Sequence, residues 1–416
     1  MKVLDSTDSF VEIQNCRTCL SAKLTEVLDL GLHPLANSLL EDVHDYEPLI
    51  PLKLIRCEDC TTVQLSVNVK PELMFQKYLW VTGTTVTARN HCENLAKLVI
   101  EKYGKKSIRV LEIGSNDGTL LQAFANNGVD EVIGIDPAQN LQPKHLKGPI
   151  SLVEGFFNDE MALKLSSSFV PVDVVIARNV LSHVPNLNNV MNGIDKLIKN
   201  DGMVVIEFHE ASKILSELHY ESIYHEHTFY HSIKSIQAAL SQIGFKIFDI
   251  SDSPISGGSH VIYASKVSRE PTSELISSLK HERENGVYHA ESWKKFSILA
   301  NRNIEQLRAI FEAEKNSNWI AFGASARSST LLNSIGEASR HLHLIADNNP
   351  LKQGKYSPGL RMPIVDPKAE INAEIEKIFI CAFNFEEEIV DFLRNNLGWS
   401  GEVVLPLPNE VRRYNI

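Results

Sequence analysis

The sequence predicts an α/β protein with an N-terminal zinc-binding module, a central Rossmann-like sheet whose last strand is antiparallel, and a C-terminal Rossmann-like domain. Three observations support this class. Four cysteines form two Cys-x2-Cys pairs near the N-terminus. Strand and helix patterns alternate between about residues 86 and 267, around the stretch VLEIGSNDGTLL at 110–121. A second strand, glycine turn and helix begins at Asn318. Such alternation is typical of a mostly parallel sheet covered by helices.

The overall composition excludes several classes of protein. A chain of 416 residues is long enough for two or three domains with separate cores. Its hydrophobic content of 43% and charged content of 22% are those of an ordinary soluble protein. The net charge of −11 argues against a general nucleic-acid surface. Because no apolar run is long enough for a membrane span and the first residues lack a signal-peptide core, we expect a cytoplasmic protein without membrane or nucleic-acid partners.

The first element, residues 1–68, is predicted to be a zinc module. Cys16 and Cys19 form one pair and Cys57 and Cys60 the other, with 37 residues between the pairs. Four thiolates from two such pairs make a closed tetrahedral zinc site, which is structural rather than catalytic. The alternative is four unrelated cysteines, which the paired spacing disfavours.

The next stretch, residues 71–85, is rich in aromatic side chains and ends in a Thr-Gly-Thr turn at 82–84. Most of its aromatic residues are expected to be packing residues. A tyrosine next to a glycine turn and close to the cofactor domain is also placed to reach a ligand, which makes Tyr78 a candidate contact.

The central domain begins with a strand, a glycine turn and a helix start, the arrangement of a nucleotide-type site. The spacing from Gly114 to the next glycine is Gly-x-x-x-Gly, which is not the dinucleotide fingerprint. A second strand delivers Asp136, 22 residues after Gly114, where an acidic side chain suits ribose hydroxyls. Glu112 and Asp117 add negative charge that would repel a pyrophosphate. The pattern therefore favours a ligand with a cationic portion, such as S-adenosylmethionine.

The central sheet is predicted to have five parallel strands followed by a pair that is mutually antiparallel, because the loop joining that pair is too short for a helix. The predicted strands are 109–113, 131–135, 151–153, 172–177, 203–208, 245–250 and 259–266. Ligands of such sheets bind at the carboxyl ends of the strands. Asn179 and His183 follow the fourth strand and therefore belong to this edge, although a lone histidine is more often structural.

The densest cluster of titratable side chains, Tyr224-His225-Glu226-His227, follows the fifth strand, and Tyr230 lies close behind. Three interpretations are open. The two histidines form a metal site, the segment is a solvated helix entrance, or one histidine is a general base. We favour the base, because the ordinary pKa of histidine is close to working pH.

The C-terminal part starts with a helical connector at 272–316. A strand and glycine turn then bring Ser325 and Arg327 to the start of a helix, where oxyanions bind. A following loop carries Lys352 and Lys355. We expect domains at 1–68, 69–267 and 268–416.

Taken together, these motifs resemble a known family, the C-methyltransferases that act on nucleotide-linked 4-keto-deoxy sugars. The resemblance spans all three parts and includes the two cysteine pairs, LEIGSNDG, ARNVLSHVPN, IYHEH, FGASARSSTLLN and DNNPLKQGKYSPG. It implies S-adenosylmethionine as cofactor, structural zinc, and a nucleotide diphosphate 4-keto-deoxy sugar as substrate. The sequence departs from the family at residues 256–260, where the family usually has histidine before the glycines and Leu-Arg after them.

The resemblance assigns roles to the candidate catalytic residues. Its base corresponds to His227, which would remove the C3 proton that the 4-keto group acidifies. The assisting catalytic residues correspond to Tyr224, Glu226, Tyr78 and His183. The candidate cofactor contacts are Glu112, Gly114, Asn116, Asp117, Asp136, Asn179 and Thr84, and the candidate substrate contacts are Ser325, Arg327, Lys352 and Lys355.

Two alternatives remain beside C3-methylation. A sugar O-methyltransferase would also need a base but no adjacent ketone. A non-catalytic protein that senses a nucleotide sugar would need neither, and the intact acidic and histidine motifs argue against it. The nucleotide, whether dTDP, GDP or CDP, stays open at this stage.

Overall fold

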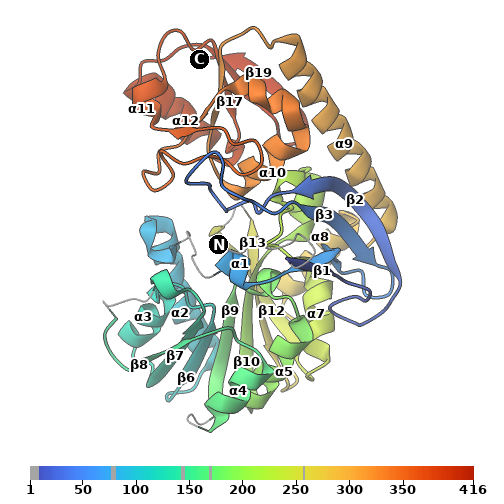
Figure 1. The fold of residues 1–416 in the computed structure, drawn as a ribbon. Coiled ribbons are helices and arrows are strands. Elements are labelled where there is room, and N and C mark those ends of the chain that lie inside the picture. The colour runs from blue at the N-terminus through green and yellow to red at the C-terminus, as the bar shows by residue number, and fades with distance from the viewer. Residues whose placement is uncertain (1–8, 76–80, 142–145, 168–170, 256–257) are drawn as a thin grey trace.

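The computed structural model describes residues 9–75, 81–141, 146–167, 171–255 and 258–416. In Figure 1 the central domain lies at the bottom, the C-terminal domain at the top, and the N-terminal strands beside and between them. The long helix α9 (Ala290–Ala313) runs along the outside and packs against β2 (Leu24–His33). The predicted α/β class in three parts is confirmed, while the exact domain boundaries stay predictions.

The central sheet has seven strands in the order β12-β13-β10-β9-β6-β7-β8. Only β13 among them is antiparallel to its neighbours β10 and β12 in the part of the chain that the structure describes, so the predicted antiparallel strand is confirmed. The strands are β6 (Arg109–Ile113), β7 (Glu131–Asp136), β8 (Ile150–Glu154), β9 (Val172–Arg178), β10 (Ile198–His209), β12 (Lys246–Ser253) and β13 (Ser259–Ser265).

Both faces of this sheet are covered, which explains the nearly continuous apolar character of its inner strands. Val110 packs with α2 and α3 on one face, and its neighbour Leu111 packs with α5 and α7 on the other. Successive side chains of a strand point to opposite faces. The faces of Val110 and Leu111 therefore fix the face to which each following residue of β6 points. The helices of the domain are α2 (Val86–Tyr103), α3 (Thr119–Asn126), α4 (Asp159–Ser166), α5 (Leu187–Leu197), α6 (Ala211–Ser216) and α7 (Ile233–Ser241).

The N-terminal module is a small sheet that takes its fourth strand from the central domain. Its order is β11-β4-β3-β2, and β11 (Phe229–Tyr230) lies directly after the predicted catalytic segment. The register pairs Phe229 with Gln64 and Tyr230 with Val63. The remaining elements are β1 (Phe10–Glu12), β3 (Ile50–Cys57), β4 (Val63–Leu65), β5 (Val67–Val69) and α1 (Glu72–Phe75).

The C-terminal domain is a second open sheet in the order β16-β15-β14-β17-β18-β19. The predicted helical connector is present as α8 (Ser273–Glu284) and α9, and the strand, glycine turn and helix after Asn318 are also present. The other elements are β14 (Trp319–Phe322), α10 (Ala326–Ile335), β15 (Ile345–Ala346), β16 (Ile364–Val365), α11 (Pro367–Glu370), β17 (Lys377–Ile380), α12 (Glu386–Asp391), β18 (Glu402–Leu405) and β19 (Arg412–Asn415).

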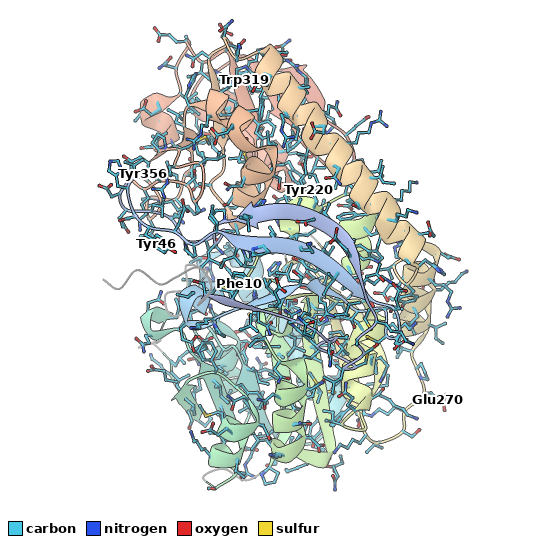
Figure 2. All side chains as sticks on the ribbon, turned by 45° about the vertical axis from the view of Figure 1, so that its right-hand side comes forward. Phe10, Tyr46, Tyr220, Glu270, Trp319 and Tyr356 are labelled. Atoms are coloured by element: carbon cyan, nitrogen blue, oxygen red, sulfur yellow. The ribbon has the colours of Figure 1, made fainter. Side chains whose placement is uncertain are left out.

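The N-terminal module also contacts the C-terminal domain. Figure 2 shows Tyr46 and Tyr356 on the side of the molecule where the two parts meet. The backbone amide of Leu40 donates to the carbonyl of Tyr356, and the amide of Tyr356 donates back, both near 3 Å. Tyr220 lies at the same level of the molecule (Figure 2), and its hydroxyl donates to Asn303 of α9. The C-terminal domain therefore contacts the N-terminal module through Tyr356 and the central domain through Asn303.

None of the helices in the described residues is long and apolar enough to cross a membrane.

Candidate active site

The carboxyl end of β6 opens into a tight glycine turn. Gly114 adopts a φ of +70°, and a Cβ there would lie 2.9 Å from a methyl carbon of Val180. Gly118 caps α3 with a φ of +75°. A side chain at Gly114 would both strain the backbone and collide, so the turn needs glycine there. The turn brings backbone close to the strand end where a ligand of this fold binds.

Asp136 ends the neighbouring strand β7 and is oriented by this turn. Its Oδ2 accepts the backbone N–H of Asn116 at 2.7 Å, and its Oδ1 accepts the N–H of Ala138 at 2.8 Å. Burial raises its pKa, and these two hydrogen bonds act in the opposite direction. The carboxylate is thus held at the edge of the sheet with lone pairs left for hydroxyl groups.

Asn116 and Asp117 face another part of the chain, the short 3₁₀ turn Thr82–Thr84. Asn116 Oδ1 accepts the N–H of Thr82 at 2.9 Å, and Asp117 Oδ2 accepts the N–H of Gly83 at 2.8 Å. Thr84 is exposed, and its hydroxyl donates to the carbonyl of Val81. The turn after the aromatic stretch is therefore fixed onto the glycine loop. Tyr78 lies outside the described residues.

Glu112 is buried at the end of β6 beside charged residues that sequence reasoning did not single out. Burial raises its pKa to about 8, and the nearby Arg178 opposes this increase. Arg178 ends β9 directly opposite Glu207 of β10, with Nε 3.4 Å from Oε2. Glu207 also lies 3.2 Å from His91 of α2 and accepts from Ser253. These side chains form one buried network under the glycine loop.

This set of residues fits a cationic methyl donor. Glu112 Oε2 is buried and has no hydrogen-bond partner among the described residues. Asp117 and Asp136 lie close enough to Glu112 for their charges to raise its pKa further. An unpartnered acidic oxygen in an acidic environment favours a positively charged ligand over a pyrophosphate.

The predicted catalytic residues Tyr224 and His227 contact each other. Tyr224 Oη lies 2.8 Å from His227 Nε2, and His227 Nδ1 lies 3.3 Å from the carbonyl oxygen of Ser222. A carbonyl only accepts, so Nδ1 carries the proton and Nε2 accepts the tyrosine hydroxyl. Burial, followed by the nearby His183, His209 and Arg327 groups, holds the pKa of His227 well below its ordinary value. The imidazole is consequently neutral and has a basic nitrogen.

The surrounding residues hold this segment in place. His183 Nδ1 donates to the backbone carbonyl of Glu226 at 2.6 Å, and its ring centroid lies 5.1 Å from that of His227. His225 turns the other way and donates to the carbonyl of Pro51. The two histidines of the segment thus have separate partners, and the cysteine cluster is the only group of three or more possible metal ligands found in the described residues.

Arg327 approaches the segment from the C-terminal domain and meets Glu221, which lies just before Tyr224 in the chain. Arg327 follows the N-terminus of α10, and its Nη1 lies 3.8 Å from Glu221 Oε1. Glu221 is fully buried, its Oε2 has no partner among the described residues, and burial raises its pKa to about 7 despite the Arg327 charge. The hydroxyl of Thr330 on α10 also donates to the carbonyl of Ile223. Helix α10 therefore packs directly on the catalytic segment.

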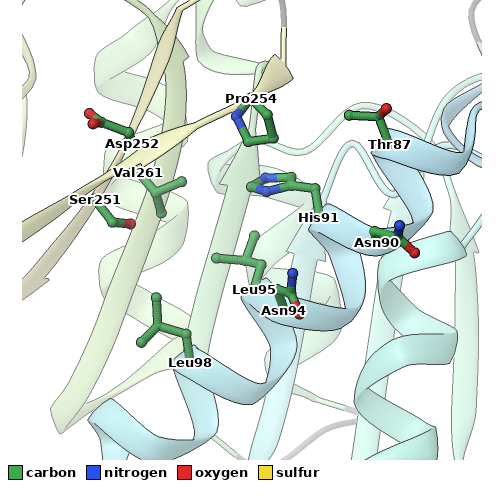
Figure 3. A pocket seen from close by; sticks show the side chains of 10 residues that line it. All are labelled: Thr87, Asn90, His91, Asn94, Leu95, Leu98, Ser251, Asp252, Pro254 and Val261. Carbon is green, nitrogen blue, oxygen red and sulfur yellow. The ribbon is translucent and has the colours of Figure 1, made fainter.

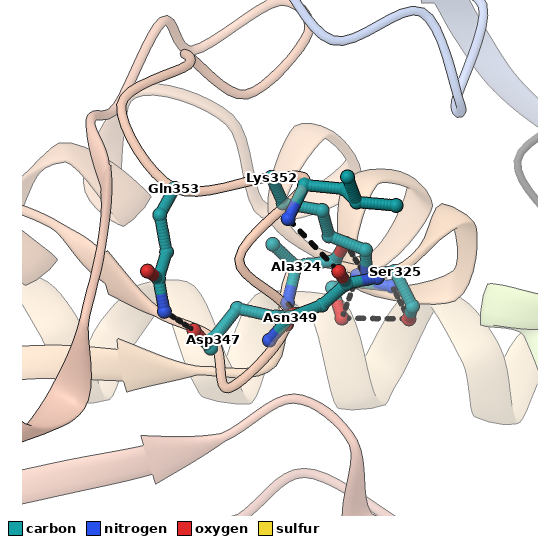
Figure 4. Close-up of polar contacts among 8 residues, drawn as sticks. Ala324, Ser325, Asp347, Asn349, Lys352 and Gln353 are labelled. Carbon is teal, nitrogen blue, oxygen red and sulfur yellow. Dashed lines mark hydrogen bonds and ion pairs between the residues drawn. The ribbon is translucent and has the colours of Figure 1, made fainter.

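Of the other predicted substrate contacts, Lys352 lies near the start of α10 and Lys355 does not. Ser325 caps α10 by accepting the N–H of Ser328 at 3.2 Å. Lys352 Nζ donates to the carbonyl of Ala324 at 2.9 Å and pairs with Asp347 (Figure 4). Lys355 instead pairs with Glu41 of the N-terminal module at 2.7 Å.

The four predicted zinc ligands come together as one cluster. The sulfur atoms of Cys16, Cys19, Cys57 and Cys60 all lie within 4.8 Å of one another. Cys16 and Cys60 sulfurs are 3.5 Å apart, as are those of Cys19 and Cys57. Zinc–sulfur bonds of about 2.3 Å in a tetrahedron place sulfurs about 3.8 Å apart, so the cluster fits zinc. All four positions are cysteine, which leaves no open coordination position for substrate.

Comparison with known proteins identifies all three parts in this order. Residues 16–75 match the model of a "Putative zinc binding domain", residues 87–250 that of a "Methyltransferase domain", and residues 254–408 that of a "C-methyltransferase C-terminal domain". The C-methyltransferase NovU of Streptomyces niveus is 27% identical over 403 residues, which is 95% of this chain and 96% of that protein. The chain is therefore an S-adenosylmethionine-dependent methyltransferase whose parts match, in order, those of C-methyltransferases.

Solved methyltransferase structures resemble less than half of this chain. Magnesium protoporphyrin IX methyltransferase of Synechocystis PCC 6803 is 16% identical over 43% of this chain and 83% of its own, with a TM-score of 0.33. The N-methyltransferase NodS of Bradyrhizobium japonicum WM9 is 13% identical over 45% of this chain and 99% of its own, with a TM-score of 0.34. Both cover less than half of this chain, so the family assignment does not depend on them.

One cavity of the methyltransferase lies away from the predicted residues. It has a volume of about 400 Å³ and lies between α2 and the hairpin of β12 and β13. Figure 3 shows His91 on its wall, between α2 and Pro254. None of the predicted catalytic, cofactor or substrate residues lines it. His91 also contacts Glu207, so the cavity adjoins the buried charge network.

Proposed function

We propose that this C-methyltransferase transfers a methyl group to C3 of a nucleotide-linked 4-keto-deoxy sugar, by means of an enolate, in the biosynthesis of a branched deoxy sugar. The observation that carries the proposal is the hydrogen bond from Tyr224 Oη to the Nε2 atom of His227. It places a neutral base beside a hydroxyl donor. Removal of a proton from carbon next to a ketone needs both groups, one for the proton and one for the enolate oxygen.

The proposed chemistry starts with an exchange of hydrogen bonds. The Tyr224 hydroxyl turns from His227 to the 4-keto oxygen, which frees the lone pair on Nε2. Nε2 then removes the C3 proton, and the electron pair moves onto the keto oxygen, where the Tyr224 hydroxyl stabilises it. The bound donor supplies an electrophilic methyl group on a sulfonium. The ketone would re-form as C3 takes the methyl group, whose bond to sulfur would break with the electron pair left on sulfur. His227 retains the proton until product leaves.

The carbonyl of Ser222 supports this role of His227. It accepts the N–H of Nδ1, and it remains a good partner when the imidazole becomes charged. We propose that His183 acts on the same segment through the backbone of Glu226. Tyr78 is proposed as a second hydroxyl donor on the resemblance alone.

The donor and acceptor contacts are part of the same proposal. Glu112 and Asp136 are proposed to meet the cationic part and the ribose of the donor, with backbone supplied at Gly114. The other candidate donor contacts are Asn116, Asp117, Asn179 and Thr84. On the acceptor side we propose Ser325, Arg327 and Lys352 for the diphosphate, with Lys355 farther out beside Glu41.

A deuterium-exchange experiment tests this function. The protein is incubated in deuterated water with a nucleotide-linked 4-keto-6-deoxy sugar and no donor, and C3 is followed by NMR. We expect deuterium at C3 in the wild type and a rate lower by about 10²–10⁴-fold in His227→Asn. The exposed His44→Asn serves as a matched control that should exchange normally.

The outcomes separate the alternatives. Absence of exchange in a wild-type protein that binds the sugar would refute the enolate and leave O-methylation or binding without turnover. Exchange that persists in His227→Asn would assign the base to another group.

A further inference from the structure

The carboxylate of Glu226 is held by a residue from the other end of the chain. Its Oε1 and Oε2 both accept from Asn37 Nδ2, each at 2.8 Å, and the two residues are 189 positions apart. Glu226 is 4% exposed, whereas Asn37 is exposed. The amide therefore reaches from an accessible position to a buried carboxylate, as expected at the mouth of a site.

Asn37 belongs to the zinc-binding part and follows the end of β2. Leu35 and Ala36 before it are buried, and the N–H of Leu39 donates back to the Asn37 carbonyl at 3.0 Å. A few residues later, Glu41 pairs with Lys355 of the C-terminal domain. The loop is thus fixed on both sides of Asn37, which leaves its side chain little freedom to move away from Glu226.

The same N-terminal part holds the rest of the catalytic segment. The N–H of Leu65 donates to the carbonyl of Thr228 at 3.0 Å, and β11 pairs with β4 immediately afterwards. The carbonyl of Pro51 accepts from His225. These contacts are to backbone or to a structural histidine. Asn37 is the one that reaches a carboxylate within the proposed catalytic set.

We propose that Asn37 is a positioning residue of the active site, which orients the Glu226 carboxylate and stabilises its ionised form. This inference rests on the proposed function for the consequence in turnover, but the interaction itself does not depend on it. A buried carboxylate without a compensating donor takes up a proton more readily. Loss of the amide would therefore convert Glu226 from an acceptor into a neutral donor.

The titration of Glu226 supports the direction of this effect. Burial raises its pKa to about 7, and the hydrogen bond from Asn37 acts against that increase. Without Asn37 the midpoint moves to higher pH, so the ionised fraction at neutral pH falls.

The test uses Asn37→Leu, which is close in size but has no hydrogen-bonding group, with the adjacent and exposed Ser38→Ala as control. Carbon-13 NMR of labelled glutamate carboxyls follows the titration, and Glu226→Gln assigns the signal. A charge-assisted hydrogen bond corresponds to a midpoint about one pH unit higher in the variant.

Turnover provides a second readout that a purely structural role would not move. The rate of C3 exchange should fall on the acidic side of its pH profile, and in Asn37→Leu this fall should move to higher pH by the same amount as the NMR midpoint. The Ser38→Ala profile should match that of the wild type. If Glu226→Gln abolishes this acidic fall in rate, adding Asn37→Leu to Glu226→Gln should not change the pH profile further. An NMR midpoint that is unchanged in Asn37→Leu would overturn the inference. So would a lower exchange rate whose pH dependence is the same as in the wild type.

The two proposals fail in distinguishable ways. A wild type without C3 exchange would refute the proposed function, while the NMR titration would still decide the role of Asn37.

Discussion

Substitution of Arg178 by methionine isolates the buried charge network beneath the glycine loop. The Arg178 side chain is 11% exposed, and its partner Glu207 is 0% exposed. Methionine keeps most of the side-chain volume but leaves the Glu207 carboxylate without its cation. The remaining contacts of Glu207 are His91 and Ser253.

The structure sets the expected size of the effect. At 3.4 Å and an effective dielectric constant of about 20, the attraction between the two charges is about 5 kcal/mol. Two other contacts remain and the carboxyl can take up a proton, so we expect a loss of about 3 kcal/mol, at the low end of the range for broken buried pairs. For a domain of this size, that corresponds to a melting temperature lower by about 6–12 °C.

The sign of the pH dependence follows from Glu207. In the wild type, burial raises the pKa of Glu207, but the His91 hydrogen bond and the Arg178 charge outweigh this and leave it lowered. A lowered folded-state pKa stabilises the protein above the unfolded value and loses that effect as pH falls. Without Arg178 the pKa rises instead, which destabilises the fold increasingly as pH rises. The stability gap between wild type and variant should therefore widen as pH rises through and above the ordinary pKa of a glutamate carboxyl, about 4.3.

Urea denaturation at several pH values measures this gap, with the exposed Arg302→Met as a control expected within about 0.5 kcal/mol of the wild type. Adding Glu207→Gln to Arg178→Met should restore more than half of the loss, because the second change removes the uncompensated charge. A loss below about 1 kcal/mol, a gap that does not depend on pH, or no rescue by Glu207→Gln would refute the reasoning.

Three other predictions concern the ligands. Zinc chelation, or Cys57→Ser, should lower the melting temperature and C3 exchange together, since β4 holds β11; activity that follows zinc in a fully folded protein would contradict a structural metal. Donor binding should release a proton below about pH 8, because a cation favours the ionised form of Glu112 whose pKa is about 8; calorimetry in phosphate and Tris measures it, and Glu112→Gln should lose it. Arg327→Met should weaken nucleoside diphosphate binding by about 10–100-fold, as for a lost charged hydrogen bond, and leave the donor Kd unchanged; an equal loss of both affinities would contradict its assignment to the acceptor side.

Local patterns in the sequence predicted much of this fold. Apolar runs located all seven strands of the central sheet, because burial on both faces leaves a continuous hydrophobic signal. Six agree within three residues at each end, whereas β10 begins five residues earlier than the prediction. The position of Asp136 at a strand end followed directly from that pattern. The cysteine pairs were equally local, since two thiolates in each pair bind the same metal.

Local sequence patterns did not predict the pairings between distant segments. The strand β11 has two residues, and its partner β4 lies more than 160 positions earlier in the chain. No periodic pattern in the sequence therefore indicates that the two strands pair. The Asn37 contact with Glu226 also depends on tertiary packing alone. A signal did exist for Glu207, since a carboxylate inside an apolar strand requires a partner, and Arg178 ends the adjacent strand.

The joining of the three parts explains why a methyltransferase of this kind carries a zinc module at all. The central sheet alone supplies the strand ends and the glycine loop, but the segment from Tyr224 to Tyr230 leaves that sheet and finishes as an edge strand of another. A two-residue strand has too few hydrogen bonds to be stable by itself, so its position depends on β4, and β4 follows the second cysteine pair directly. The metal is thus remote from the proposed base His227, yet the position of that residue relative to the donor loop depends on the sheet that the metal stabilises. Helix α10 contacts the other side through Thr330, so that the C-terminal domain also packs on the segment that carries the proposed base.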